Sequence, residues 1–319
     1  MREQTYKHRQ YNILLKEGFV SGIKKGWSGF IWMLKIVIPI SFLTALLAWS
    51  GWLNKIDFFI QPAMTLINLP AMAALPLLIG MLSNLYGAIA AMAVLPLTNE
   101  QMTLIAIFLL TAHNLIQEGV IQGKSGMHPV KATLFRLTAA VITVSLVAQF
   151  FDAAALGPVT AEASVPVSQP FIYMLKSWSL ATFYLCIKIF VIIMSILTLL
   201  EVVKSLGWID HVVRVLTPVL KILGLRRNVG ILWVTATVFG LAYGGAVIVE
   251  EAKQGHLTKD ELEELHLSIG IHHSLIEDPA LFLSLGLSAF WLWVPRLIMA
   301  MIAVRLLSLW HLARKRWHR

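Results

Sequence analysis

The sequence has little charge, one cysteine and none of the common signatures of enzymes. Only 13% of its 319 residues are charged, whereas an average soluble domain has about 25%. Its one cysteine, Cys186, excludes an intramolecular disulfide and any cysteine-based metal cluster. GxxxxGK(S/T) loops, GxSxG elbows and HExxH strings are all absent. We therefore expect no catalytic residues, no resident cofactor and a protein that is not an enzyme.

Apolar residues are abundant: they make up 58% of the chain, and the mean hydropathy is +0.75. A hydrocarbon core of about 30 Å is crossed by about 20 apolar residues in a helix. The expected spans are 30–49, 71–96, 132–150, 178–202, 228–249 and 290–309. The first 25 residues are polar and basic without a cleavage-site pattern, so we expect no cleaved signal peptide. The expected fold class is an all-α membrane protein, with the lipid bilayer as its partner.

The net charge of +9 is concentrated in a few segments of the chain. The segments rich in Lys and Arg are 1–27, 119–131, 203–227 and 311–319. The stretch 151–170 carries no Lys or Arg, and 250–264 is rich in Asp and Glu. Because cytoplasmic loops carry an excess of Lys and Arg, we expect both termini in the cytoplasm and these two stretches on the opposite side. This pattern predicts a multi-pass protein of the inner (cytoplasmic) membrane and no nucleic-acid partner.

A polar motif occurs twice at a fixed spacing. The stretches His113–Glu118 (HNLIQE) and His273–Asp278 (HSLIED) align at an offset of 160 residues. Further pairs at similar offsets are Arg136 with Arg296 and Tyr86-Gly87 with Tyr243-Gly244. Two homologous halves that each cross the membrane an odd number of times insert in opposite orientations, as in many secondary transporters. We therefore expect two inverted-topology repeats, each with about three transmembrane helices plus a short re-entrant or broken helix.

The repeats divide the chain into a cytoplasmic amphipathic segment, a first membrane repeat, an extracytoplasmic linker, a second membrane repeat and a basic cytoplasmic tail. Their expected ranges are 1–27, 28–150, 151–170, 171–310 and 311–319. Within the repeats, 100–118 and 265–286 are the short segments expected to be re-entrant or broken. In inverted-repeat transporters, corresponding short segments form the substrate site near the membrane midplane.

The broken spans, the Gly244-Gly245 pair and the HSLIED string resemble the Gate-domain family, also called nucleoside-recognition domain proteins. The resemblance covers most of residues 30–309. Gate domains also occur in nucleoside transporters and in ferrous-iron transport protein B, so the resemblance implies transport of nucleosides or of a divalent metal. The chain lacks the GTPase domain of the iron transporter and has no cysteines in the corresponding segments, which weakens a direct iron-channel analogy. A homodimer is a candidate assembly on analogy alone.

The repeated motifs hold the candidate substrate or ion site. Its residues are His113, Asn114, Gln117, Glu118, His272, His273, Ser274, Glu277 and Asp278. Ionisable groups at membrane depth are costly and usually functional, and an imidazole beside carboxylates can bind a divalent ion, relay protons or hydrogen-bond a substrate. On a helix His273 and Glu277 share a face, so with Asp278 they form the candidate metal set. The alternative is a structural hydrogen-bond network that closes a re-entrant turn.

Other polar and glycine residues are candidates for gating or for lining a cavity. They are Asn84, Tyr86, Tyr243, Gly244, Gly245, Glu250, Arg136 and Arg296. For the two arginines, snorkelling to the membrane surface is the default expectation, and pairing with Glu118 and Asp278 is the alternative. For Glu250 the ordinary interpretation is an interfacial carboxylate. His266 is expected to be an ordinary loop or interface histidine.

The sequence thus predicts a secondary transporter or permease that moves a small polar, nucleoside-like solute or a divalent metal ion by alternating access. A proton, sodium ion or divalent metal ion bound at the repeated motif would couple to the movement. A non-transporting membrane scaffold, or a subunit of a larger complex, is the alternative, and it requires polar motifs that are fully satisfied internally. An intramembrane enzyme is a third interpretation, for which the sequence shows no preferred reaction.

Overall fold

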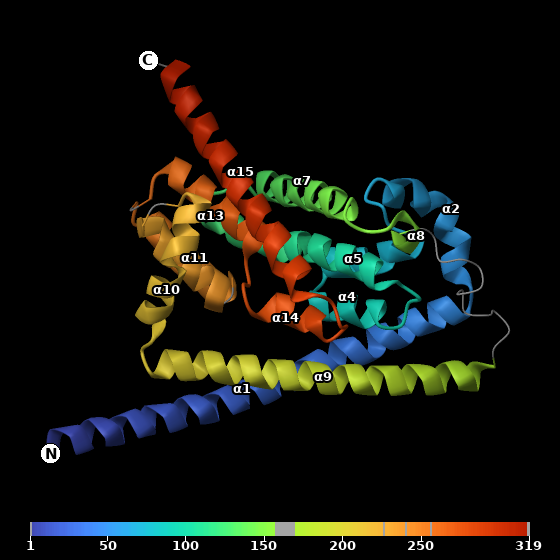
Figure 1. Cartoon of the computed structure of the whole chain (residues 1–319), viewed down its shortest axis with the longest axis horizontal. Coiled ribbons are helices and arrows are strands. Elements are labelled where there is room, and N and C mark those ends of the chain that lie inside the picture. Colours follow the sequence, from blue (N-terminus) through green and yellow to red (C-terminus); the bar gives the residue numbers. More distant parts are fainter. Residues whose placement is uncertain (1, 157–169, 226, 240, 256, 318–319) are drawn as a thin grey trace.

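The computed structural model describes residues 2–156, 170–225, 227–239, 241–255 and 257–317, which are helical and contain no strand (Figure 1). The helices of the first half are α1 (Arg2–Trp49), α2 (Trp52–Thr65), the 3-10 turn η1 (Ala71–Ala73), α3 (Ala74–Leu82), α4 (Leu85–Met92), α5 (Asn99–Ala112), α6 (Leu115–Lys124), α7 (Pro129–Ala148) and α8 (Ala153–Leu156). Those of the second half are α9 (Phe171–Ser205), α10 (Ile209–Leu223), α11 (Arg227–Phe239), α12 (Leu241–Lys253), α13 (Lys259–His272), α14 (Glu277–Leu283) and α15 (Ala289–Trp317). The all-helical prediction is confirmed.

The two longest helices, α1 and α9, run antiparallel along one side of the molecule (Figure 1). Gly18, Gly22 and Gly26 form a stripe of small residues on α1 that lies directly on the backbone and side chains of α9. Small residues let membrane helices approach closely and gain packing contacts where lipid supplies no hydrophobic driving force. Helix α1 therefore continues without interruption through the boundary expected at residue 27, and its basic first part packs against α9 from Gly18 onward.

We expect Gly22→Leu to disrupt this helix pair. A Cβ atom at residue 22 would overlap the backbone of Thr198, so a leucine side chain fits there only if α1 and α9 move apart. Overpacking of a tight contact costs roughly 1–3 kcal/mol or more. The matched control is Gly29→Ala, whose added Cβ would lie 3.6 Å from its nearest neighbour, Leu197 Cδ1. The melting temperature in detergent should fall for Gly22→Leu and stay near wild type for Gly29→Ala; equal melting temperatures would show that this contact does not hold the helices together.

Within the described residues, five segments are long and apolar enough to cross a membrane. They are Gln10–Trp49, Asn99–Lys124, Pro129–Ala148, Phe171–Ser205 and Ala289–Arg316. The second of these comprises α5 and α6, with a break at His113. The segment 100–118, expected as the re-entrant element, therefore belongs to a broken helix of crossing length.

The expected span 71–96 is instead a pair of short helices that fold back on each other. A Cβ on Gly80 of α3 would lie 3.2 Å from the Ala88 Cβ of α4, and one on Gly87 would lie 2.7 Å from Ile79 Cγ2. The helices separate at Asn84, whose side chain accepts a hydrogen bond from Gly87 N (3.0 Å) and starts α4. Neither helix has the about 20 residues that a crossing needs. The expected span 228–249 is likewise divided into α11 and α12, which pack against each other.

The acidic stretch 250–264 lies at the same end of the molecule as the C-terminal helix end, which contradicts the expectation that it faces the opposite side. Asp260 pairs with Lys315 (2.6 Å), and Glu263 pairs with Lys131 (2.8 Å). Asp and Glu contribute little to membrane orientation, so the acidic residues gave no topological signal. They neutralise basic side chains of α7 and α15 instead.

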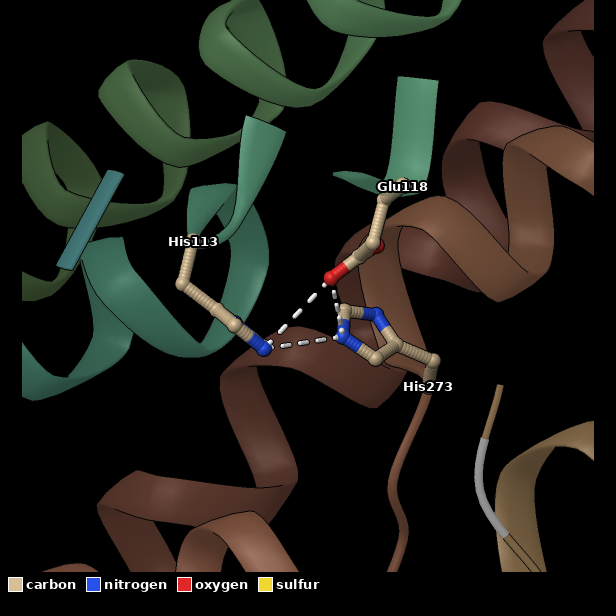
Figure 2. A group of neighbouring side chains, drawn as sticks. All are labelled: His113, Glu118 and His273. Carbon is tan, nitrogen blue, oxygen red and sulfur yellow. Dashed lines mark hydrogen bonds and ion pairs between the residues drawn. The ribbon is translucent and has the colours of Figure 1, made fainter. Parts of the chain in front are cut away.

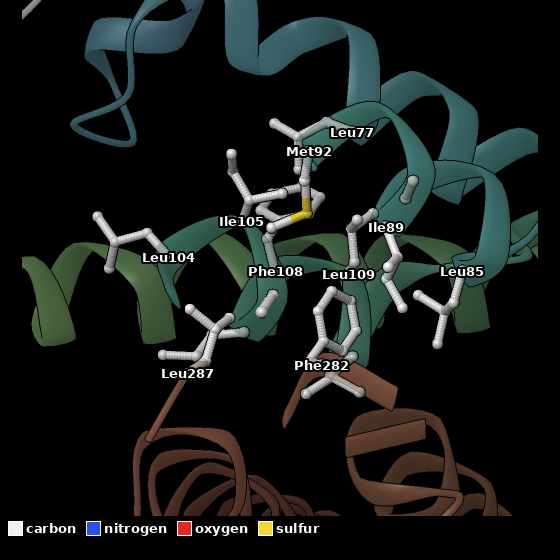
Figure 3. Close-up of a cluster of buried hydrophobic side chains, with 14 of the residues drawn as sticks. Leu77, Leu85, Ile89, Met92, Leu104, Ile105, Phe108, Leu109, Phe282 and Leu287 are labelled. Carbon is white, nitrogen blue, oxygen red and sulfur yellow. The ribbon is translucent and has the colours of Figure 1, made fainter. Parts of the chain in front are cut away.

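Helix α5 lies at the centre of the molecule and is buried on nearly all sides (Figures 1 and 3). Leu104, Ile105 and Leu109 are completely buried, and α5 packs against α3, α7, α13, α14 and α15. Phe282 of α14 and Leu287 complete this apolar cluster from the second half (Figure 3). Because α5 is packed on all sides, its two ends are held in fixed positions. One of these ends is the break at His113.

Candidate functional site

Two helix breaks, one in each half, have the same backbone geometry. His113 ends α5 with φ −89° and ψ 167°, and His273 ends α13 with φ −87° and ψ 169°. The next residues, Asn114 and Ser274, both have left-handed backbones, with φ of 52° and 48°. A left-handed conformation costs a residue other than glycine roughly 1–2 kcal/mol, so both breaks are held by surrounding contacts.

The contacts that hold the breaks are also the same. The His113 Nδ1 lies 2.8 Å from Leu109 O, and the His273 Nδ1 lies 3.1 Å from Ile269 O. A buried arginine then donates from Nη2 to the carbonyl of each histidine: Arg136 to His113 O (2.7 Å) and Arg296 to His273 O (3.0 Å). Backbone N–H groups beyond each break donate to the neighbouring short helices, from Asn114 to Gly80 O and from Leu275 to Thr237 O.

The two breaks meet, and they bring three polar atoms together in the interior (Figure 2). The Nε2 atoms of His113 and His273 are 3.4 Å apart, and Glu118 Oε1 lies 3.4 Å from the first and 3.1 Å from the second. Their side chains are at most 8% exposed. Asp278 Oδ2 approaches the same group, at 3.5 Å from His113 Nε2. We call His113, Glu118, His273 and Asp278 the central cluster.

With both imidazoles neutral, the central cluster presents lone pairs with no hydrogen between them. A carbonyl oxygen only accepts hydrogen bonds, so each histidine carries its hydrogen on the Nδ1 that faces one. In a neutral imidazole the Nε2 is then an acceptor, and an ionised carboxylate accepts only. The two Nε2 atoms and Glu118 Oε1 therefore repel one another unless a cation lies between them. That cation is either a proton on an imidazole or a metal ion.

The donor atoms have the spacing that a small metal ion requires. Bonds of about 2.0–2.1 Å in a tetrahedral site place neighbouring ligand atoms about 3.3–3.4 Å apart. The sides of the triangle in Figure 2 are 3.1–3.4 Å, and Asp278 Oδ2 lies 3.5 Å from one of its corners, His113 Nε2. Two imidazoles and carboxylates are ligands typical of zinc and other first-row transition metals. The residues present therefore fit a divalent transition-metal ion.

Outer contacts hold these ligands as they do in metal sites. Each imidazole is oriented by its Nδ1 contact to a carbonyl oxygen, and outer partners of this kind fix the tautomer of a ligating histidine. Arg136 Nη1 binds Glu118 Oε2 at 2.8 Å, and Arg136 Nε donates to Thr111 O at 2.9 Å. This leaves Glu118 Oε1 directed at the two histidines (Figure 2).

The expected metal set of His273, Glu277 and Asp278 is not the set that the structure assembles. The backbone from His273 to Ile276 is not helical, so His273 and Glu277 do not share a face as i and i+4 residues. Glu277 instead accepts a hydrogen bond from Tyr86 Oη at 3.3 Å. The candidate ligands come from both halves, because the two breaks face each other.

The other residues of the repeated motifs make local contacts and do not belong to the central cluster. His272 stacks on Trp233, with ring centroids 6.5 Å apart, and is not part of the central cluster. Ser274 Oγ accepts from the backbone N of Asp278 at 3.1 Å. Asn114 Nδ2 donates to Gln117 Oε1 at 3.2 Å, and Gln117 is exposed.

Of the candidates for gating, Asn84 caps α4 and Tyr86 donates to Glu277, and the other six divide into three groups. Arg136 and Arg296 are 2% and 0% exposed, so the default expectation of snorkelling is wrong for both. Gly245 of α12 packs against α6, where a Cβ on Gly245 would come within 2.7 Å of Ile121 Cγ2, and the exposed Glu250 accepts from Gln254 Nε2 at the end of α12. The side chain of Tyr243 and the surroundings of Gly244 lie outside the described residues.

Two buried polar residues of this region did not emerge from the sequence as site residues. Gln122 lies one helical turn after Glu118, and His266 is 3% exposed within α13 rather than in a loop. The i, i+4 spacing from Glu118 could have indicated Gln122. No comparable signal indicated His266, because the chain has ten histidines, most of them outside the repeated motif.

The fold and the central cluster define a helical membrane protein with buried ionisable residues at two helix breaks, and comparison with known proteins agrees. Residues 30–122 match the family model Gate, described as nucleoside recognition, which confirms the resemblance for a segment that contains His113 and Glu118. The uncharacterized membrane protein YvoD of Bacillus subtilis (strain 168) is 25% identical over 292 residues, which cover 90% of this chain and 93% of that protein. No solved structure gives a significant match.

Proposed function

We propose that the protein is a secondary transporter that carries a divalent transition-metal ion across the inner membrane by alternating access, with the central cluster as its binding site. The observation that carries this proposal is the convergence of imidazole and carboxylate lone pairs on one buried point, at 3.1–3.4 Å from one another. Ionisable groups at membrane depth usually mark an ion pathway. The Lys- and Arg-rich end that carries both termini is the cytoplasmic end in this proposal.

The positions of the equivalent helices support an inverted-repeat design. Helix α5 starts at the end where the linker begins, since Thr98 Oγ1 donates to Ala155 O (2.9 Å). Its equivalent, α13, starts at the opposite end, beside the C-terminal part of α15, through the Asp260–Lys315 pair. Both start with the same threonine capping box and end at a histidine of the central cluster. Two half-helices thus reach the site from opposite membrane surfaces, as in secondary transporters.

One asymmetry between the halves suggests how the site alternates. Arg136 holds Glu118 at 2.8 Å, whereas Nε and Nη1 of Arg296 make no hydrogen bond and Asp278 lies beside His113. In inverted-repeat transporters the two halves exchange conformations as the protein changes its open side. In the opposite conformation, Arg296 therefore holds Asp278 as Arg136 now holds Glu118. This exchange of conformations between the two halves opens the binding site to the other side of the membrane.

A metal ion fits the site better than a nucleoside-like solute, because His113 Nε2, His273 Nε2 and Glu118 Oε1 lie 3.1–3.4 Å from one another. That spacing leaves room for one ion and not for a sugar and a base. A scaffold would satisfy its polar motifs internally, yet Gln122, His266 and Arg296 all retain buried polar atoms without partners. These atoms favour transport over a structural role.

The proposal is tested by metal uptake into proteoliposomes that contain a trapped metal-sensitive dye. We expect uptake of Zn²⁺ or Co²⁺ but not of Mg²⁺, which prefers octahedral oxygen ligands. Uptake of none of these ions by cooperatively folded protein would overturn the proposal.

A further inference from the structure

Two buried polar side chains next to the central cluster, Gln122 and His266, have polar atoms without hydrogen-bond partners. Gln122 is 1% exposed, and neither its amide nitrogen nor its amide oxygen makes a hydrogen bond. His266 is 3% exposed, and apart from a contact with the backbone of Ser125 its ring nitrogens have no partner. An unsatisfied buried polar group costs roughly 1–3 kcal/mol, so several such atoms in one region are costly to keep.

These side chains form a continuous line from the central cluster toward the end of the molecule that carries the termini. Gln122 follows Glu118 by one turn of α6, and its Nε2 would lie 3.4 Å from a Cβ on Gly270 of α13. His266 precedes Gly270 by one turn of α13 and lies beside the backbone of Ser125, where α6 ends. The line thus runs between α6 of the first half and α13 of the second.

The equivalent positions in the other direction are apolar. At the offset of 160 residues, Gln122 corresponds to Phe282 and His266 corresponds to Ala106, and both of these are completely buried. Since apolar side chains fill the equivalent positions, folding of a repeat does not require a polar side chain there. The polar atoms therefore answer a need that exists on one side only.

The line ends at a charged group that closes it at the surface. Glu263 precedes His266 by three residues, and it pairs with Lys131 of α7 at 2.8 Å. The same carboxylate contacts His311 Nε2 of α15 at 3.0 Å. These contacts join the two halves, because α7 belongs to the first and α13 and α15 to the second.

We infer that Gln122, Ser125 and His266 line the half of the translocation path that leads from the central cluster to the terminal end, where water and the divalent cation enter in the opened conformation. The inference rests on the proposed function. Opening separates α6 from α13 and breaks the Lys131–Glu263 pair. Water and a hydrated cation then supply the hydrogen-bond partners that Gln122 and His266 lack in the closed conformation.

The test is cysteine labelling in a Cys186→Ser background, which removes the native thiol. Gln122→Cys and His266→Cys are treated with a membrane-impermeant thiosulfonate, applied separately to each side of oriented vesicles. Phe282→Cys and Ala106→Cys are the matched controls at the equivalent buried positions. We expect labelling at residues 122 and 266 from the terminal side alone, and none at 106 or 282 from that side.

A second measurement separates the path from the binding site. His266→Leu should reduce uptake and leave Co²⁺ affinity unchanged, because residue 266 is not a ligand. Absence of labelling at 122 and 266 from the terminal side, in protein that binds Co²⁺, would overturn the path and leave the proposed function intact. Labelling of all four positions alike would also overturn it, since general loosening would explain it. The expected labelling without any Co²⁺ binding would support the path and reject the metal cargo.

Discussion

Glu118→Gln is expected to abolish metal binding and uptake. Glu118 Oε1 is the atom that completes the triangle with the two Nε2 atoms, and the amide retains the shape of the side chain but loses its negative charge. Mutation of an outer partner already weakens metal affinity about 10–100-fold, so loss of a charged ligand should cost at least about 100-fold. Isothermal titration of Zn²⁺ or Co²⁺ into purified protein measures the effect.

The matched control is Glu277→Gln, a substitution of the same type on the neighbouring motif. Glu277 accepts a hydrogen bond from Tyr86 Oη and is not part of the central cluster. The metal affinity of the Glu277→Gln protein should therefore stay within a small factor of the wild-type affinity. If Glu277→Gln removed binding and Glu118→Gln did not, the ligands would come from the HSLIED motif alone. The assignment of the central cluster would then be wrong.

Arg136→Met is expected to destabilise the folded protein by about 3–5 kcal/mol, since it leaves the buried charge of Glu118 uncompensated. Arg136 is 2% exposed and binds Glu118 at 2.8 Å, so solvent cannot replace it. The double variant Arg136→Met with Glu118→Leu should recover much of the loss, because no unpaired charge remains. Urea unfolding in detergent micelles gives the free energies.

Arg296→Met provides the comparison at the equivalent position. Nε and Nη1 of Arg296 make no hydrogen bond, and its Nη2 donates to His273 O. Removal of this side chain should therefore lower the free energy of unfolding by about 1–2 kcal/mol. Equal losses for the two arginines would show that the Arg136–Glu118 pair is no more important than a single hydrogen bond. The asymmetry between the halves, and with it the proposed exchange, would have no energetic basis.

The duplicated motif predicted which residues lie close together better than it predicted how they are arranged. The shared offset of 160 residues indicated His113, Glu118, His273 and Asp278, and the structure brings these four together. The backbone breaks after the two histidines, however, so helical spacing within one motif indicated a candidate metal set other than the group that the structure brings together. A break fixed by a buried arginine and a distant carbonyl leaves no local pattern in sequence.

Four of the six expected spans, 30–49, 132–150, 178–202 and 290–309, correspond to long apolar helices, whereas 71–96 and 228–249 are pairs of short helices. Hydropathy measures apolar content over a window and does not show where a chain folds back, so 71–96 looked like a crossing. The sequence did contain the relevant signal at Asn84, a residue type that favours helix N-caps. The place of the acidic stretch depended on pairing with Lys131 and Lys315, which lie far away in the chain.

The most direct test of the central claim is the zinc K-edge absorption fine structure of purified protein equilibrated with one equivalent of Zn²⁺. The account predicts a first shell of nitrogen and oxygen at about 2.0–2.1 Å, with the outer-shell scattering of two imidazoles. In His113→Ala and in His273→Ala one imidazole should be lost from this signal. A shell of water oxygens alone, or protein that retains no zinc after desalting, would contradict a metal site between the two helix breaks.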